Sequence, residues 1–179
     1  MEILRKKKGF TLTEVLLVLG LAAIIIITTL MMYPKISANM RASKEAHNIT
    51  IIGAGVKVLY NSSPYYTGLD TDVAVKGNVF PDSILEGTSK TPMNVWKGVI
   101  ELAPGNDGPS GATDSSFSIT DPNIPALECI HLVTEVNSNF YQVKINGTTV
   151  KSPSINFDPA IITQACNSPN NNSVVFISF

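Results

Sequence analysis

One carboxylate of this sequence lies where a charged group is costly. Glu14 stands near the start of an apolar run over residues 10–33, directly after the basic residues Arg5 and Lys6–Lys8 and the small residue Gly9. A charged side chain within a membrane helix costs about 2.5–3.5 kcal/mol on insertion scales, which makes it a candidate for function by default. Glu14 is therefore the leading candidate, with an interfacial residue of no special role as the alternative.

The other reactive side chains are two cysteines, Cys129 and Cys166, and two histidines, His47 and His131. In an exported chain the cysteines would form one disulfide, whereas in the cytosol they would stay free thiols. A Cys129–His131 nucleophile is not supported, because residues two apart on a helix do not face each other. We expect the histidines on helix surfaces or in intersubunit contacts, and we expect no enzymatic activity.

Acidic residues in the expected loops could in principle bind calcium, but their spacing does not match an EF-hand loop. These residues are Asp70, Asp72, Asp107 and Asp114. Solvated loop carboxylates are the simpler interpretation, so we expect no metal and no cofactor.

Composition separates an apolar N-terminus from an ordinary, polar remainder. The chain has 179 residues, of which 44% are hydrophobic and 15% charged, with a net charge of -1. Soluble domains carry about 25% charged residues. Without the basic start the remainder is net acidic and has no basic patch, so nucleic acid is not expected as a partner.

The apolar run over residues 10–33 is long enough to cross a bilayer as a helix, which takes about 20 residues. It is too long for the apolar region of a secretory signal, and the bulky residues 28–33 do not form a small-residue cleavage site. The basic cluster should stay cytoplasmic, and the chain after Tyr33 should lie across the membrane. An uncleaved single-pass anchor is the simplest alternative at this point.

The next segment, residues 34–61, predicts an amphipathic continuation of the same helix, from about Phe10 to Asn61. The apolar face is expected to contain Ile36, Met40, Ala46, Ile49, Ile52, Val56 and Leu59 or Tyr60. The charged residues Arg41, Lys44, Glu45 and Lys57 are expected mostly elsewhere on the helix.

Two kinds of residue should disturb this long helix. Pro34 should kink it, because proline removes a backbone hydrogen bond and clashes with the preceding turn. Gly20, Gly53 and Gly55 each weaken it by about 1 kcal/mol relative to alanine. The glycines permit either close helix packing or local melting, and both alternatives stay open.

Residues 62–179 predict a globular α+β head. Residues 62–94 are expected to be irregular, apart from a helical turn at 82–86. Strands are expected at Val95–Leu102, from Phe117, at 140–145 and 148–151 and at Ser173–Phe179, with an exposed turn at 103–116.

The pair Asn146-Gly147 suits a type I′ hairpin turn, which explains the glycosylation sequon at Asn146 more simply than an attached sugar does. Helices are expected at 125–136 and 158–165, the second with an Asp cap and Pro at its first position. The final strand should be paired inside the sheet.

The residues Gly9-Phe10-Thr11-Leu12-Thr13-Glu14 resemble the signature of type IV pilins and their relatives. The resemblance implies that a prepilin peptidase cuts between Gly9 and Phe10 and that the same enzyme N-methylates Phe10. It also implies that Glu14 pairs with the Phe10 amine of a neighbouring subunit in a filament. A buried charge left without its partner costs several kcal/mol, so Glu14 would set the register between subunits.

The head adds to this resemblance. Residues 66–70, 79–82 and 96–102 and the pair Cys129–Cys166 are similar to type IVb pilins, among them the bundle-forming and conjugative thin-pilus subunits. A disulfide would close a loop of about 38 residues and contribute roughly 3–4 kcal/mol. The short leader and the mature Phe10 are more like type IVa pilins, and the cysteine spacing lies between the two types.

We therefore expect the pilin fold, an α+β fold in which a long N-terminal helix packs against an antiparallel sheet. The expected parts are a cleaved leader (1–9), a transmembrane and filament-core helix (10–33), the amphipathic half of that helix (34–61) and the head (62–179). The resemblance implies a subunit that polymerises with itself, helped by prepilin peptidase, an inner-membrane assembly platform and an assembly ATPase.

The precursor would lie in the bacterial inner membrane with a periplasmic head, and the product would be an extracellular fibre. A type II secretion pseudopilin, a minor pilin and a membrane-anchored binding domain that does not polymerise are the alternatives.

Overall fold

The computed structural model describes residues 9–179, so the basic residues and all but the end of the expected leader lie outside the described residues. The chain forms two compact units with a boundary between Ser37 and Ala38. The first unit contains the N-terminal part of helix α1 (Leu12–Leu59), and the second contains the rest of that helix and the whole head.

Helix α1 has the extent that the sequence predicts to within two residues at each end, and it contains Pro34. The kink expected at Pro34 stays a prediction. Past the unit boundary the helix turns one face into the core. The buried residues of that face are Ala38, Ala42, Glu45, Ala46, Asn48, Ile49, Ile52, Gly53 and Val56.

The expected composition of this face is partly wrong. Ile36 and Met40 are 54% and 69% exposed, whereas Glu45 is fully buried. The buried positions 38, 42, 45, 49, 52 and 56 follow the alternating steps of three and four that define one helical face. Glu45 belongs to that face by its position, and its charge led to the wrong assignment.

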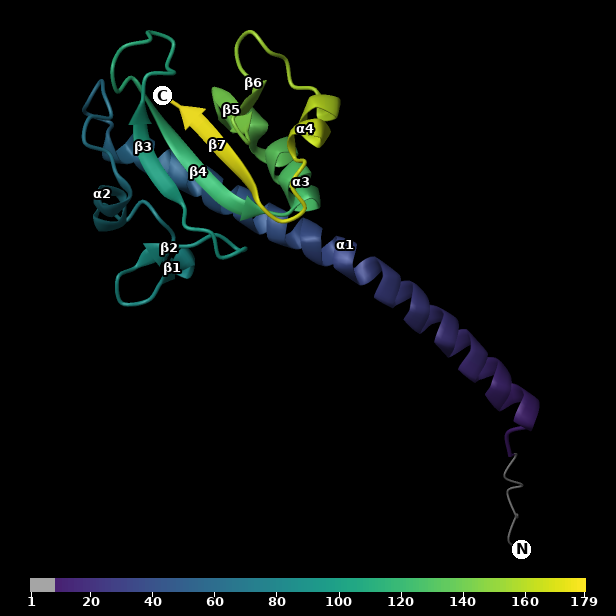
Figure 1. Cartoon of the computed structure of the whole chain (residues 1–179). Helices are drawn as coiled ribbons and strands as arrows, with labels where there is room; N and C mark the ends of the chain where they lie inside the picture. The colour runs from purple at the N-terminus through teal and green to yellow at the C-terminus, as the bar shows by residue number, and fades with distance from the viewer. Residues whose placement is uncertain (1–8) are drawn as a thin grey trace, which may run out of the picture. The chain divides into compact units, whose positions relative to one another are not determined.

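The head is built on a five-stranded antiparallel sheet, as predicted, and the second half of α1 passes behind it (Figure 1). The strand order is β3-β4-β7-β5-β6, and every neighbouring pair is antiparallel. The strands are β3 (Glu101–Gly105), β4 (Ser116–Ile124), β5 (Gln142–Ile145), β6 (Thr148–Lys151) and β7 (Asn172–Ser178). The C-terminal strand β7 lies between β4 and β5, which confirms that this apolar strand is not an edge.

The hairpin between β5 and β6 has the predicted turn. Asn146 and Gly147 have φ values of 50° and 81°. Positive φ at both central residues defines a type I′ turn, whose twist matches that of the two strands.

Residues 95–100 do not form the strand expected there, and β3 begins only at Glu101. The side chain of Asn94 accepts hydrogen bonds from the N–H groups of Trp96 (2.9 Å) and Gly98 (2.7 Å). Asparagine competes with strand hydrogen bonding in this way and closes a turn. Gly98 is required there, since a Cβ would lie 2.7 Å from the carbonyl oxygen of Pro122.

The exposed turn expected from residue 103 starts later, because β3 continues to Gly105.

The segment expected to be irregular contains a helix, α2 (Thr71–Lys76), capped by the Asp70 side chain. A 3-10 turn (Asp82–Ile84) follows, as predicted, and then the short hairpin of β1 (Leu85–Glu86) and β2 (Thr91–Pro92). The expectation of an irregular segment is therefore wrong. The sequence did contain a signal for α2, because Asp70 is a residue type that commonly caps a helix N-terminus.

Helices α3 (Ala126–Val136) and α4 (Pro159–Ala165) confirm the two helices predicted in the head, and a second 3-10 turn (Asn137–Asn139) follows α3. Asp158 caps α4 by accepting a hydrogen bond from Ala160 N–H at 2.8 Å, and Pro159 occupies the first turn. Pro125 is the residue before α3 rather than part of its first turn.

Two glycines of α1 permit close packing in the head. A Cβ on Gly53 would lie 3.3 Å from the Phe140 ring, and one on Gly55 would lie 3.1 Å from a methyl carbon of Val79. Both glycines lie inside the regular helix. Close packing, rather than local melting, therefore accounts for Gly53 and Gly55.

The buried face of α1 should contribute strongly to the stability of the head. Ile52 is fully buried, whereas its neighbour Ile51 is 37% exposed. We predict that Ile52→Ala lowers the free energy of unfolding by about 2–5 kcal/mol, because it removes buried methyl groups and leaves a cavity. The matched control Ile51→Ala should cost less than about 1 kcal/mol. Urea denaturation of the full chain in detergent measures both values, and equal losses would contradict this packing.

Candidate functional site

The residues expected to be processed lie at the start of the described chain. Gly9 and Phe10 are exposed, and Phe10 is 85% accessible. Thr11 comes directly before α1, and its carbonyl oxygen accepts the hydrogen bond of Val15 N–H. Helix α1 therefore begins at Leu12, just after the expected cleavage site between Gly9 and Phe10.

Thr11 and Glu14 form a capping box at this helix end. The Thr11 N–H donates to Glu14 Oε2 (3.1 Å), and the Glu14 N–H donates to Thr11 Oγ1 (3.3 Å). This reciprocal pair satisfies two backbone donors that a helix start leaves open, and the carboxylate also suits the positive end of the helix dipole. Glu14 thus has a local role within the chain, in addition to the intersubunit role expected from the resemblance.

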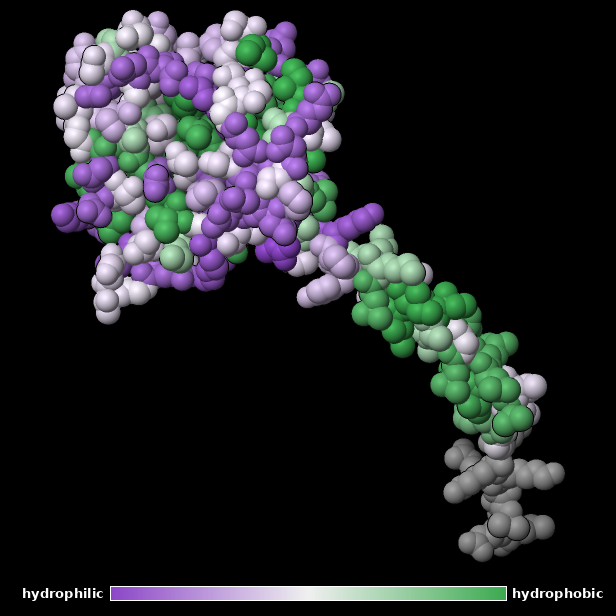
Figure 2. Space-filling view, in the orientation of Figure 1, coloured by the Kyte–Doolittle hydropathy of each residue, from purple (hydrophilic) through white to green (hydrophobic). Residues whose placement is uncertain are grey.

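The N-terminal part of α1 exposes apolar side chains on all its faces, and Figure 2 shows those on the face in view. Its most apolar 18-residue window has a mean hydropathy of 2.8 and no buried share. Among the described residues it is the one helix that is long and apolar enough to cross a membrane. Soluble proteins rarely expose apolar patches of this size, so lipid or protein must cover this surface.

Hydroxyl groups within this apolar helix are satisfied by its own backbone. Thr28 Oγ1 donates to the carbonyl of Ile25 (2.9 Å), and Thr29 Oγ1 donates to the same carbonyl (2.8 Å). Unsatisfied polar groups are costly in an apolar environment. The segment can therefore enter lipid or a protein core without leaving these groups unpaired.

Cys129 and Cys166 form a disulfide with their Cα atoms 6.0 Å apart. Cys129 lies on α3 and Cys166 directly follows α4, and both are buried. The bond joins α3 to the end of α4, and the two cysteines are 37 residues apart in the sequence. The disulfide expected for an exported chain is thus present.

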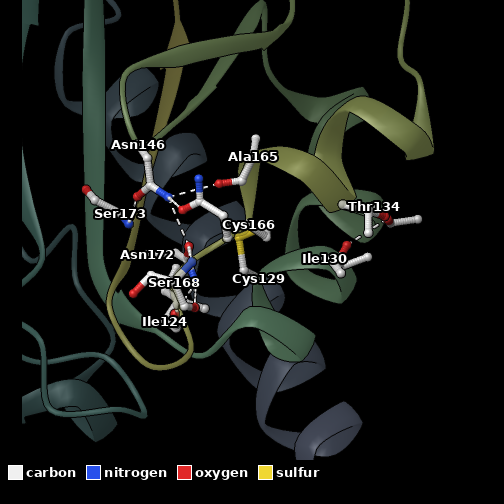
Figure 3. Close-up of a disulfide and its surroundings, with 12 residues drawn as sticks. Ile124, Cys129, Ile130, Thr134, Asn146, Ala165, Cys166, Ser168, Asn172 and Ser173 are labelled. Carbon is white, nitrogen blue, oxygen red and sulfur yellow. Dashed lines mark hydrogen bonds between the residues drawn. A yellow bond between two sulfur atoms is a disulfide. The ribbon is translucent and has the colours of Figure 1, made fainter.

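An asparagine network lies beside the disulfide (Figure 3). Asn172 is fully buried, and its amide donates to the carbonyls of Ile124 (2.8 Å) and Ser168 (2.6 Å). Its Oδ1 accepts a hydrogen bond from Asn146 Nδ2 at 2.9 Å. The network connects the β5–β6 turn to the start of β7 and to the end of β4.

The same contacts explain the sequon at Asn146. Its Nδ2 also donates to the Ala165 carbonyl (2.9 Å), and its Oδ1 accepts from Ser173 N–H (2.9 Å). A sugar on this nitrogen would break the contacts that position the turn. The structural interpretation of Asn146 is therefore the better supported one.

A pair of carboxylates inside the head was not among the candidates from the sequence. Glu45 on α1 and Asp121 on β4 are both fully buried. Burial raises the pKa of Asp121 well above its usual range, and the nearby Glu45 carboxylate raises it further. Burial also raises the pKa of Glu45, against the lowering effects of Val95 N–H, the Asn48 amide and the Lys44 charge. The position of Glu45 on the helix was the available signal.

Within residues 9–179, no three His, Cys, Asp or Glu side chains lie together in a way that could hold a metal ion. Among the loop acids considered for calcium, Asp70 caps α2 and Asp107 contacts Lys144 at 3.3 Å. His47 and His131 are exposed on α1 and α3. Gly9, Phe10 and Glu14 thus lie at or just before the start of α1, in the first unit, and the disulfide belongs to the second unit.

Two family models match the chain. One, described as a prokaryotic N-terminal methylation motif, matches residues 4–30. The other, described as PilS N terminal, matches residues 39–179, which is most of the chain. The chain belongs to the type IV pilin family.

Curated relatives and solved structures agree with this membership. The pilin is 24% identical over 151 residues to the major structural subunit of bundle-forming pilus from Escherichia coli O127:H6 (strain E2348/69 / EPEC), covering 82% of this chain and 76% of the relative. It is also 24% identical over 135 residues to the subunit of the same name from Escherichia coli O111:H-, covering 74% and 68%. The expected resemblance to bundle-forming subunits is confirmed.

Two crystal structures share the fold. TcpA, a type IV pilin from Vibrio cholerae El Tor biotype, has a TM-score of 0.57 at 15% identity, over 78% of this chain and 99% of that chain. A type IVb pilin from Salmonella typhi has a TM-score of 0.59 at 19% identity, over 75% and 97%. At these identities the likeness concerns the fold, and it confirms the predicted pilin fold of a long helix on an antiparallel sheet.

The disulfide should be a major source of stability in the pilin head. We predict that the double variant Cys129→Ser, Cys166→Ser lowers the free energy of unfolding by about 3–4 kcal/mol, because the unfolded chain regains the freedom of the closed loop. Denaturant unfolding of the full chain measures the loss. Dithiothreitol should destabilise the wild type by a similar amount and leave the double variant unchanged. A wild type insensitive to the reductant would contradict a structural role for the bond.

Proposed function

We propose that this pilin is a structural subunit that prepilin peptidase cleaves between Gly9 and Phe10 and that then polymerises through α1 into a type IV pilus. One observation carries the proposal. An apolar helix, exposed on all faces, follows the Gly9–Glu14 motif and continues into a head with its own core and disulfide. A helix that leaves the membrane for a filament needs such a surface, since other copies must cover what lipid covered before.

The processing step is supported by the local structure of the cleavage site. Gly9 and Phe10 precede the first helical residue, Leu12, and are exposed. The match of residues 4–30 to the N-terminal methylation motif supports methylation of Phe10 by the same peptidase. Cleavage there removes the basic leader and leaves the apolar helix as the N-terminus of the mature chain.

Glu14 is proposed to pair with the Phe10 amine of a neighbouring subunit. Cleavage creates this amine, and burial among packed helices would leave the Glu14 carboxylate without water. A buried charge needs a hydrogen-bonded partner of opposite sign, or it costs several kcal/mol. The capping box uses one face of the carboxylate for Thr11 and holds Glu14 at the helix end where the amine of another copy would arrive.

The proposal places the precursor in the bacterial inner membrane with its head in the periplasm, and the product in an extracellular fibre. An assembly platform in the inner membrane and an assembly ATPase are the proposed partners, beside further copies of the chain. Adhesion, aggregation, conjugation and motility are the uses proposed for such a fibre, and no catalytic role is assigned to the chain. A pseudopilin shares the N-terminal motif, but the match of residues 39–179 and the bundle-forming relatives favour a pilin.

Processing can be tested at the N-terminus of the mature chain. We predict that fibres sheared from the cell surface contain a chain that starts at N-methylated Phe10, because cleavage precedes assembly. Mass spectrometry of the intact subunit and of its N-terminal peptide measures both the cut and the methyl group. An intact Met1 in the membrane fraction, with no fibres, would instead support an anchored domain that does not polymerise.

The charge of Glu14 can be separated from its capping role. Glutamine also accepts the Thr11 N–H in a capping box, but it carries no charge. We predict that Glu14→Gln and Glu14→Ala both leave cleavage intact and both reduce the yield of surface fibres at least tenfold, a loss consistent with an unpaired buried amine. Immunoblots of processed subunit and sheared fibre measure the two steps. Normal fibres from Glu14→Gln would show that the cap, not the charge, is what assembly needs.

A further inference from the structure

The buried carboxylate of Glu45 holds a loop of the head against α1. Its Oε2 accepts hydrogen bonds from Val95 N–H (3.1 Å) and from the amide of Asn48 (3.3 Å). Its other oxygen, Oε1, is buried and has no hydrogen-bond partner. Leaving such an acceptor unsatisfied in the interior is costly, because it has lost its contact with water.

Asp121 holds the same loop from the sheet. Asn94 Nδ2 donates to Asp121 Oδ1 and to the Pro122 carbonyl, both at 2.6 Å. Asp121 lies where the register of β4 against β7 shifts, a kind of irregularity that re-aims side chains. Its Oδ2 is also buried without a hydrogen-bond partner.

The two carboxylates therefore contact adjacent residues of one loop, and each keeps one buried, unpartnered oxygen. Two ionised carboxylates in this position would repel each other in a medium that screens poorly. A single proton on either carboxyl group would remove this repulsion and would give the pair a donor for an unpartnered oxygen.

The neighbouring basic groups do not replace that proton. Lys44 on α1 is the cation whose charge acts on Glu45, and it does not bring the pKa of Glu45 down to its usual range. Arg41 on α1 pairs with Glu128 of α3 at 2.5 Å, and Lys97 of the loop pairs with Glu86. On the sheet side, Asp121 Oδ1 accepts from the uncharged Asn94 amide, which also donates to the Pro122 carbonyl.

We propose that Glu45 and Asp121 share one proton, held between Glu45 Oε1 and Asp121 Oδ2, and that this proton fastens the loop of residues 94–98 to α1 and β4. The proton comes from solvent when the head folds and returns to solvent when the loop opens. The site is a property of the single subunit, so it stands independently of the proposed assembly into a fibre.

The sign of the pH dependence follows from the raised pKa of Asp121. Opening exposes the carboxyl and returns its pKa toward the usual value of 3.8. The closed state therefore binds more protons than the open state above that pH. The stability of the closed loop is fully present below about pH 4 and is lost as the pH rises through the pKa of the folded state.

Amide hydrogen exchange of the full chain in detergent micelles tests the proposal directly. The amides of Val95, Trp96 and Gly98 report on the loop, because they donate to Glu45 or to Asn94. After correction for the intrinsic exchange rate, their protection should fall up to about tenfold per pH unit until the folded-state pKa is reached. Infrared absorption of a neutral carboxyl group at neutral pH gives a second, direct readout.

Asp121→Asn keeps the shape of the side chain and an N–H for Glu45 Oε1, but it cannot ionise. In this variant the protection of the loop amides should vary at most about twofold between pH 5 and pH 8, and the infrared band should be absent. Asp72→Asn, which changes an exposed aspartate of α2, is the matched control and should keep the wild-type slope and band.

Two results would overturn the proposal. One is a wild type whose loop protection has the same pH slope as Asp121→Asn and which shows no neutral carboxyl band. The other is a gain of protection on adding calcium chloride at neutral pH in the wild type and not in Asp121→Asn, since the pair would then hold a cation in place of the proton.

Discussion

The need to cover an apolar helix governs the rest of this pilin. The N-terminal part of α1 carries exposed leucine, isoleucine, valine and methionine side chains on every face. A helix satisfies its own backbone, so it can move from lipid to a protein interior without exchanging hydrogen bonds. Only the groups at its first turn and the side chain of Glu14 must find new partners. In the proposed assembly, packing and one charge are then what matter, and no refolding is needed.

An apolar segment that other molecules cover requires a head that is stable by itself. The buried face of α1 past Ala38, the internal strand β7 and the disulfide all belong to the second unit. The core of that unit is continuous from Ile49 on the helix to Phe176 on the sheet. Because the core cluster of the head contains residues from Ala46 onward and none of the apolar segment, that segment is left available for lipid or for other copies of the chain.

The sequence predicted best those elements that carry local signals. The hairpin turn at Asn146, the capped helix after Asp158 and the apolar strand at the C-terminus were all found, because each follows from neighbouring residues. The strand expected from Val95 was wrong, since the Asn94 side chain binds the backbone of the next residues and closes a turn. The N-terminal methylation motif was recognisable from its residues alone. The position of Glu45 on the buried helix face could be read from the sequence, but its pairing with Asp121 could not, because that depends on the tertiary fold.

Glu14 and Glu45 illustrate two solutions to the same problem on one helix. A carboxylate removed from water must either bind a cation or take up a proton. Glu45 meets another acid inside the same subunit, so a shared proton is the solution that needs no second molecule. Glu14 lies on a surface that other molecules must cover, so in the proposed pairing its charge is kept until a cation arrives. The first arrangement closes a loop within one subunit, whereas the proposed second one would make the correct neighbour a condition for burying the helix.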